Sequence, residues 1–203
     1  MSALPTTFAR VPLTSMDPSM LVFELDRETR RLMPVDCELL TSAATMASFL
    51  HRDQTRFVRG NLARAPYVEH PLRVALRLVR WGVRDGEIIA AALLHDTAED
   101  CTAELLKHFG HDDEDAVGCL ARLYGARVAE LVAQVTNPVA CGSRDAASRA
   151  AYLEHVRALA GSDSPAMLIK ASDLKDNAGS IRYQLGHGKD QKMLSKLRKY
   201  LPA

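Results

Sequence analysis

The feature that most constrains this chain is a helical spacing of apolar residues that persists from residue 36 almost to the end. The first stretch, about residues 36–53, repeats apolar residues every three or four positions, which places them on one side of a helix. Further helices are predicted over residues 68–81, from 85 onward, and over 102–110, 114–124, 126–135, 144–160, 164–185 and 189–201. Since no alternating apolar and polar pattern runs long enough for a strand, we expect an all-α bundle of about eight to ten helices.

The first 35 residues differ from the rest of the chain. Four prolines interrupt them, at Pro5, Pro12, Pro18 and Pro34, and no helical pattern persists between these positions. We therefore predict an irregular N-terminal arm over residues 1–35 and one helical domain over residues 36–203. A chain of 203 residues is long enough to bury one sizeable core.

Charge and hydropathy exclude several classes of protein. The formal net charge of +1 argues against a chain that coats nucleic acid. No run of 18 apolar residues predicts a membrane helix, and the N-terminus lacks the pattern of a secretory signal. The cysteines are well separated and form no C-x-x-C pair, which predicts reduced thiols in a cytoplasmic protein; they are Cys37, Cys101, Cys119 and Cys141. We expect neither a nucleic-acid nor a membrane partner, and a homo-oligomer remains possible.

The segment that carries chemistry follows a strongly apolar stretch over residues 88–94. Removing His95 and Asp96 from water costs free energy unless another group pairs with them, and a metal ion is one such partner. Glu99 lies one helical turn beyond His95 and Asp96, and Asp100 lies one turn beyond Asp96. The simpler alternative is an acidic helix end with a capping aspartate and a hydrogen-bonded histidine.

Two other segments favour the metal. His70 begins a predicted helix within Pro-Tyr-Val-Glu-His-Pro, directly after an arginine-rich stretch. Asp173 lies inside an otherwise apolar helical segment, where Asp173, Asn177 and Ser180 share one face of the helix. Each segment alone also fits a simple structural explanation, namely a histidine at a helix start or an acid on the surface.

Together these segments resemble the HD phosphohydrolase superfamily, whose metal ligands come as a histidine, an adjacent His-Asp pair and a distant aspartate. The resemblance extends to the hydrolase domain of the RelA/SpoT alarmone enzymes, and most of all to their small single-domain relatives such as the metazoan SpoT homologues. It rests on H-D-T-x-E-D at residues 95–100, P-Y-x-x-H-P at residues 66–71 and H-x-x-Q-x-R at residues 51–56. It covers roughly residues 38–185.

The resemblance implies a metal-dependent hydrolase that removes the 3′-pyrophosphate of the small anionic nucleotide (p)ppGpp. The implied metal is manganese, although two imidazoles and two carboxylates also suit iron, cobalt or zinc. Glu99 and Asp100 would orient and deprotonate the attacking water. The implied metal ligands are His70, His95, Asp96 and Asp173. The expected substrate-binding residues are Arg56, Asn177 and Ser180, together with Tyr152 and Arg149 on the preceding helix.

Three departures from the alarmone hydrolases leave other substrates as alternatives. Phe57 and Leu174 stand where basic residues are common, and the loop before His70 is longer. The alternatives are an HD phosphatase that acts on a 5′-nucleotide or on the 2′-phosphate of NADPH, and a metal-bound nucleotide-binding module without turnover. A chain that binds no metal ranks last. We also expect Arg77, Arg80 and Arg84 to face solvent.

Overall fold

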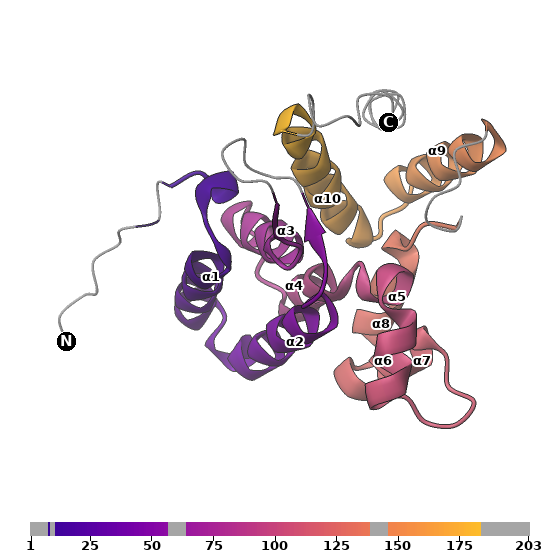
Figure 1. Ribbon diagram of the computed structural model, residues 1–203, viewed down its shortest axis with the longest axis horizontal. Coiled ribbons are helices and arrows are strands. Elements are labelled where there is room, and N and C mark those ends of the chain that lie inside the picture. Colours follow the sequence, from indigo (N-terminus) through magenta and orange to yellow (C-terminus); the bar gives the residue numbers. More distant parts are fainter. Residues whose placement is uncertain (1–7, 9–10, 57–63, 139–145, 184–203) are drawn as a thin grey trace.

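The computed structural model describes residue 8 and residues 11–56, 64–138 and 146–183. Over these residues the chain forms ten α-helices, three short 3-10 turns and one two-stranded ladder, so the prediction of an all-α bundle is confirmed (Figure 1). Phe57, Cys141 and the predicted helix over residues 189–201 lie outside the described residues.

The helices fall into consecutive groups along the chain (Figure 1). The first group is α1 (Pro18–Leu32), α2 (Cys37–Leu50), α3 (Glu69–Arg80) and α4 (Gly86–Leu94). Next come α5 (Thr97–Asp100), α6 (Thr102–Phe109), α7 (Ala116–Tyr124) and α8 (Ala126–Val135). The last are α9 (Ala146–Ala160) and α10 (Ala166–Ser180). The 3-10 turns span Leu13–Ser15, Pro34–Asp36 and Ile181–Tyr183.

A small ladder precedes α3. Strands β1 (Thr55–Arg56) and β2 (Ala65–Pro66) are antiparallel, with Thr55 opposite Pro66 and Arg56 opposite Ala65. The ladder fixes the backbone of Arg56 beside the segment that leads into α3, although its two-residue strands are too short to show an alternating pattern in the sequence.

Helix α4 forms the centre of the bundle. It begins at Asp85, whose side chain accepts hydrogen bonds from the amides of Glu87 and Ile88, as an N-cap residue does. Every residue from Ile88 to Leu94 is buried, and α2, α3, α8 and α10 all pack against this helix. A helix that is apolar on all sides requires such surroundings, and its C-terminal end therefore delivers His95 into the interior.

The prediction of an irregular arm is wrong for residues 18–32, which form helix α1. Asp17 caps this helix by accepting a hydrogen bond from the Met20 amide, and Pro18 occupies its first position, where a proline disrupts no helical hydrogen bond. Leu21 and Leu25 are buried in the same core as α3 and α4. The prolines therefore mark the boundaries of a helix rather than an irregular segment.

Within the described part of the chain, no helix is both long enough and apolar enough to cross a membrane. Three of the four cysteines fall in this part, and Cys37, Cys101 and Cys119 are free thiols.

Candidate active site

Three helices bring His70, His95, Asp96 and Asp173 together inside the bundle. His70 lies in the first turn of α3, His95 and Asp96 follow the end of α4, and Asp173 lies in the middle of α10. The Nε2 atom of His70 is 3.2 Å from Oδ1 of Asp173 and 3.4 Å from Oδ2 of Asp96. The Nε2 atom of His95 is 3.2 Å from the same Asp96 oxygen and 3.8 Å from Oδ1 of Asp173. Four residues far apart in sequence thus direct their polar atoms at one point.

The other nitrogen of each imidazole is held by the protein. Nδ1 of His70 lies 2.8 Å from Oδ2 of Asp176, and Nδ1 of His95 lies 2.8 Å from the carbonyl oxygen of Ala92. Both acceptors favour the tautomer with the proton on Nδ1, which leaves each Nε2 lone pair free to ligate.

Asp176 is a buried anion that the sequence reasoning missed. Arg73 donates to both of its oxygens, at 2.8 and 2.9 Å, and Arg77 donates to Oδ1 at 2.9 Å. Burial works against the charge of Asp176, but the hydrogen bonds from His70 and Arg73 hold its pKa well below the usual range. The expectation that Arg77 faces solvent is therefore wrong, because α10 covers this side of α3 and supplies Asp176 as its partner. Arg80 is half-buried against Glu28, and Arg84 is exposed as expected.

The group at the centre fits a divalent metal ion. Ligand atoms of His70, His95 and Asp173 all lie within 4.8 Å of one another, and the three residues are buried. Nε2 of His95 is buried without a hydrogen-bond partner, a costly arrangement unless another species binds there. Although burial opposes the charged form, the carboxylates of Asp96 and Asp173 raise the pKa of His95 well above its usual value. The same two carboxylates would stabilise a cation at Nε2, which must lose its proton before it can ligate a metal.

The acidic pair Glu99 and Asp100 lies one helical turn beyond the His-Asp pair, on α5. Both the backbone amide and the side-chain amide of Asn137 donate to Oε2 of Glu99, at 3.2 and 2.8 Å. Burial, followed by the charges of Asp96 and Glu99, raises the pKa of Asp100 to about 6. A carboxyl group with such a pKa can both accept and release a proton near neutral pH.

Tyr67 joins the two acidic groups, and the sequence reasoning gave it no role. Its hydroxyl group donates to Oδ2 of Asp96 at 2.7 Å and to Oδ2 of Asp100 at 3.5 Å. Its ring lies against the imidazole of His51, and the guanidinium of Arg56 is 5.4 Å from the ring centroid. The sequence signal for such a role of Tyr67 is its position in the motif Pro-Tyr-Val-Glu-His-Pro.

The three main candidates for substrate binding lie together, beside the candidate metal ligands. Arg56 donates from Nη2 to Oδ1 of Asn177 at 2.8 Å and to Oγ of Ser180 at 3.3 Å. The side-chain amide of Asn177 in turn donates to Oδ1 of Asp173. The predicted shared face of Asp173, Asn177 and Ser180 is therefore present, and it brings the Arg56 guanidinium close to the candidate metal ligands.

The two candidates on α9 differ from each other. Tyr152 is buried, and its ring centroid lies 5.6 Å from the Nζ atom of Lys170, one turn before Asp173 on α10. Arg149 is half-buried one turn before Tyr152, and none of the described contacts joins it to the candidate metal ligands. Lys170 itself is a buried cation that the sequence reasoning missed.

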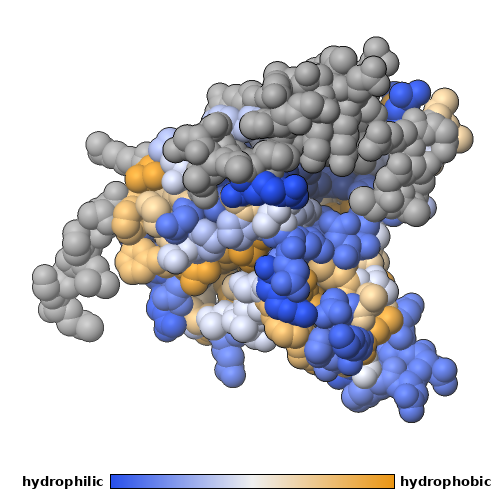
Figure 2. All heavy atoms as spheres, in the orientation of Figure 1, coloured by the Kyte–Doolittle hydropathy of each residue, from blue (hydrophilic) through white to orange (hydrophobic). Residues whose placement is uncertain are grey.

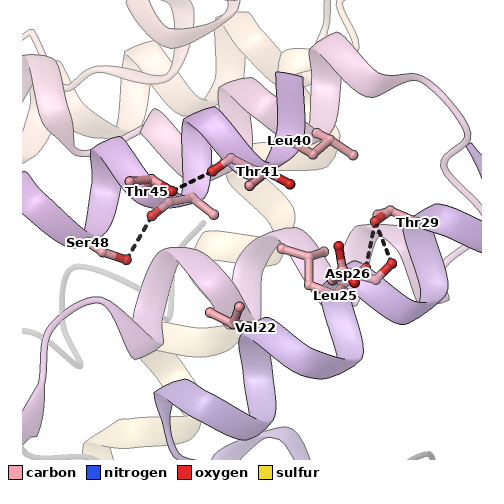
Figure 3. Close-up of a pocket in the computed structure, with 9 residues that line it drawn as sticks. Val22, Leu25, Asp26, Thr29, Leu40, Thr41, Thr45 and Ser48 are labelled. Atoms are coloured by element: carbon pink, nitrogen blue, oxygen red, sulfur yellow. Dashed lines mark hydrogen bonds between the residues drawn. The ribbon is translucent and has the colours of Figure 1, made fainter. Parts of the chain in front are cut away.

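A cleft of about 280 Å³ lies elsewhere, between α1 and α2 (Figure 3). The hydroxyl groups of Thr29, Thr45 and Ser48 donate to carbonyl oxygens of their own helices, so they offer no donor to a ligand. Near this cleft α1 exposes Val22 and Phe23, and Figure 2 shows apolar surface on the α1 side of the molecule. None of the candidate metal ligands lines this cleft.

The fold and the site together define the class of this protein. It is a helical bundle in which two imidazoles and two carboxylates meet at one buried point, a candidate metal centre. Comparison with protein families specifies the class: the HD domain model matches residues 43–196, about three quarters of the chain. The chain belongs to the HD domain family.

The chain is also similar to curated proteins from animals and bacteria. It is 38% identical over 89 residues to guanosine-3′,5′-bis(diphosphate) 3′-pyrophosphohydrolase MESH1 of Xenopus tropicalis, a match that covers 42% of this chain and 48% of that protein. It is 36% identical over 99 residues to MESH1 of Homo sapiens, covering 48% and 47%. It is 33% identical over 163 residues to guanosine-3′,5′-bis(diphosphate) 3′-pyrophosphohydrolase of Aquifex aeolicus, covering 77% and 20%. The chain thus spans about half the length of the MESH1 relatives and a fifth of the bacterial one.

Proposed function

We propose that this chain is a metal-dependent phosphohydrolase that releases pyrophosphate from the 3′-position of (p)ppGpp. The observation that carries the proposal is the convergence of His70, His95, Asp96 and Asp173, with the acidic pair on one side and Arg56 on the other. Membership of the HD domain family and the names of the relatives support the same chemistry and this substrate. A cytoplasmic location, as the cysteine pattern predicts, is part of the proposal.

In this proposal the two Nε2 atoms and the carboxylates of Asp96 and Asp173 hold the metal, with manganese as the preferred ion. A divalent ion in this place activates a water molecule and polarises a phosphoryl oxygen. Asp176 and the carbonyl of Ala92 keep the imidazole rings in the ligating tautomer. The arrangement orients the ligands before substrate arrives, so little reorganisation is needed during the reaction.

The acidic pair moves the proton. Water attacks the phosphorus next to the ribose 3′-oxygen, and the bond between that phosphorus and the ribose oxygen breaks. The acidic pair Glu99 and Asp100 takes up one proton from the attacking water and returns it to the departing ribose 3′-oxygen, which leaves as a hydroxyl group. The products are pyrophosphate and GDP or GTP.

The polar group around Arg56 binds the nucleotide. A guanidinium pairs with phosphate and stacks on a base, and Asn177 and Ser180 hold the Arg56 guanidinium beside Asp173. The substrate is thereby placed with its phosphate groups toward the metal and its sugar toward α10.

The test incubates manganese-loaded protein with ppGpp, pppGpp, 5′-nucleotides and NADPH and identifies the phosphorus products by NMR. We expect pyrophosphate from the first two compounds, and a loss of roughly 100-fold or more in kcat for Glu99→Gln. An enzyme that leaves ppGpp intact but cleaves another nucleotide would overturn the substrate, and an inert protein that only binds nucleotide would overturn the activity.

A further inference from the structure

The connection after α8 contains a hydrogen-bond relay that the proposed mechanism has not used. Lys170, on α10, is 3% exposed, and its Nζ atom donates to Oδ1 of Asn137 at 3.3 Å and to the carbonyl oxygen of Val135 at 3.2 Å. The Nδ2 atom of the same Asn137 side chain donates to Oε2 of Glu99 at 2.8 Å. A buried lysine and the acidic pair are therefore linked through one amide group.

The chemistry of the partners fixes the orientation of that amide. A lysine ammonium only donates hydrogen bonds, and a carboxylate only accepts them. The carbonyl end of the Asn137 side chain must therefore face Lys170, and its NH2 end must face Glu99. Rotation of the amide by half a turn would place NH2 against ammonium and oxygen against carboxylate, losing both bonds. Lys170 thus makes Asn137 a donor toward Glu99.

Lys170 also contacts one of the candidate metal ligands. The Nζ atom of Lys170 lies 3.6 Å from Oδ2 of Asp173, one turn along α10, and it lies over the ring of Tyr152. One buried cation thus faces a candidate metal ligand directly and the candidate base Glu99 through Asn137. The backbone amide of Asn137 also donates to Glu99, so the carboxylate receives two donors from one residue.

We infer that Asn137 is a positioning residue for Glu99, and that Lys170 positions Asn137. The two donors hold one Glu99 oxygen, which leaves the other to meet the attacking water. The inference rests on the proposed function for its kinetic consequence, but the relay itself is a property of the folded chain. Loss of the Asn137 side chain removes one of the two donors that hold Glu99 and changes no metal ligand, so turnover should fall while metal binding and substrate affinity persist.

The kinetic test uses the manganese-loaded protein and ppGpp. We expect Asn137→Ala to lower kcat by about 10- to 100-fold with KM and metal content unchanged, as is typical for residues that orient a reacting group. Asn137→Asp should lower kcat further, because it places a second carboxylate against Glu99. Thr136→Ala is the matched control, since the Thr136 hydroxyl donates to Val132 within α8.

A double-mutant cycle separates positioning from general structure. If Asn137 acts through Glu99, adding Asn137→Ala to Glu99→Gln should cause little further loss of kcat. An equal loss in both backgrounds would overturn the inference, as would a wild-type kcat in Asn137→Ala.

A second measurement needs no turnover, so it separates failure of the relay from failure of the proposed substrate. In metal-loaded protein, the side-chain NH2 signal of Asn137, identified by its loss in Asn137→Ala, should be protected from hydrogen exchange. Lys170→Met and Glu99→Ala should each remove this protection, whereas Thr136→Ala should not. Protection that survives both substitutions would overturn the relay, whatever the substrate.

Discussion

At the scale of single residues, the candidate site holds two carboxylates and a buried imidazole nitrogen that the described part of the chain leaves without a hydrogen-bond partner. Asp96 and Asp173 both face Nε2 of His95, which has no hydrogen-bond partner of its own. Burial opposes the ionised form of Asp173, but the neighbouring imidazoles of His70 and His95 hold its pKa well below the usual range. Two anions and two imidazoles with their lone pairs directed inward are the environment that a divalent cation stabilises.

Asp100 gives a prediction that needs no metal. Its pKa rises from 3.8 to about 6 on folding, so between these values the folded protein holds a proton that the unfolded chain has released. The contribution of Asp100 to the free energy of unfolding therefore falls as pH rises through this window and is constant above it. Asp100→Asn removes the ionisable group, so its stability gain over wild type should grow from about pH 4 to about pH 6 and then level off.

Thermal unfolding of metal-free protein across this pH range measures the effect. Asp112→Asn, at an exposed position outside the site, controls for the loss of a surface carboxylate. A gain from Asp100→Asn that is the same at every pH would contradict the assignment.

At the scale of elements, the patterns in the sequence predict most of the helices after residue 36, and some of these helices carry clear boundary signals. Asp85 caps α4, which begins where the sequence predicts a helix from residue 85 onward. Gly82, with φ of +97°, ends the turn after α3 as only glycine does readily. Helix α10 ends at Ser180 rather than at residue 185, because the chain tightens into a 3-10 turn over Ile181–Tyr183.

What the sequence could not provide are the partners that only tertiary packing supplies. Asp176 resembles a surface acid until α10 packs on α3 and meets Arg73 and Arg77. Asn137 lies in a connection without helical periodicity, and nothing local indicates that Glu99 faces it. The four candidate metal ligands stand out in the sequence because their motifs are recognisable, whereas the groups that orient them have no fixed spacing.

Helix α1 supplies the prediction at this scale. It precedes the residues that the HD domain model matches, yet Leu21 is completely buried. We expect Leu21→Ala to lower the free energy of unfolding by about 2–5 kcal/mol, because the cavity cannot fully collapse. Val22→Ala, at a neighbouring position on α1 with 42% exposure, should cost less than about 1 kcal/mol. Chemical denaturation measures both, and equal losses would show that α1 does not share the core.

At the scale of the whole molecule, the candidate metal centre joins segments that the rest of the chain keeps far apart in sequence. Its residues come from the start of α3, the end of α4 and the middle of α10, and these three helices pack on one another. A cation held by all three would bind only the folded state, because the unfolded chain does not assemble the ligands. Metal binding and global stability should therefore be coupled.

Removal of the metal tests this coupling. Free manganese at about 100 times its dissociation constant should stabilise the wild type by about 2.7 kcal/mol, and a chelator should reverse the gain. Asp173→Ala should abolish the gain, whereas Lys175→Ala, exposed two residues further along α10, should keep it. Because protons compete for the histidines and carboxylates, the gain should also shrink as pH falls. Equal stabilisation of both variants in thermal unfolding would show that manganese binds elsewhere, and the proposed metal centre would then be wrong.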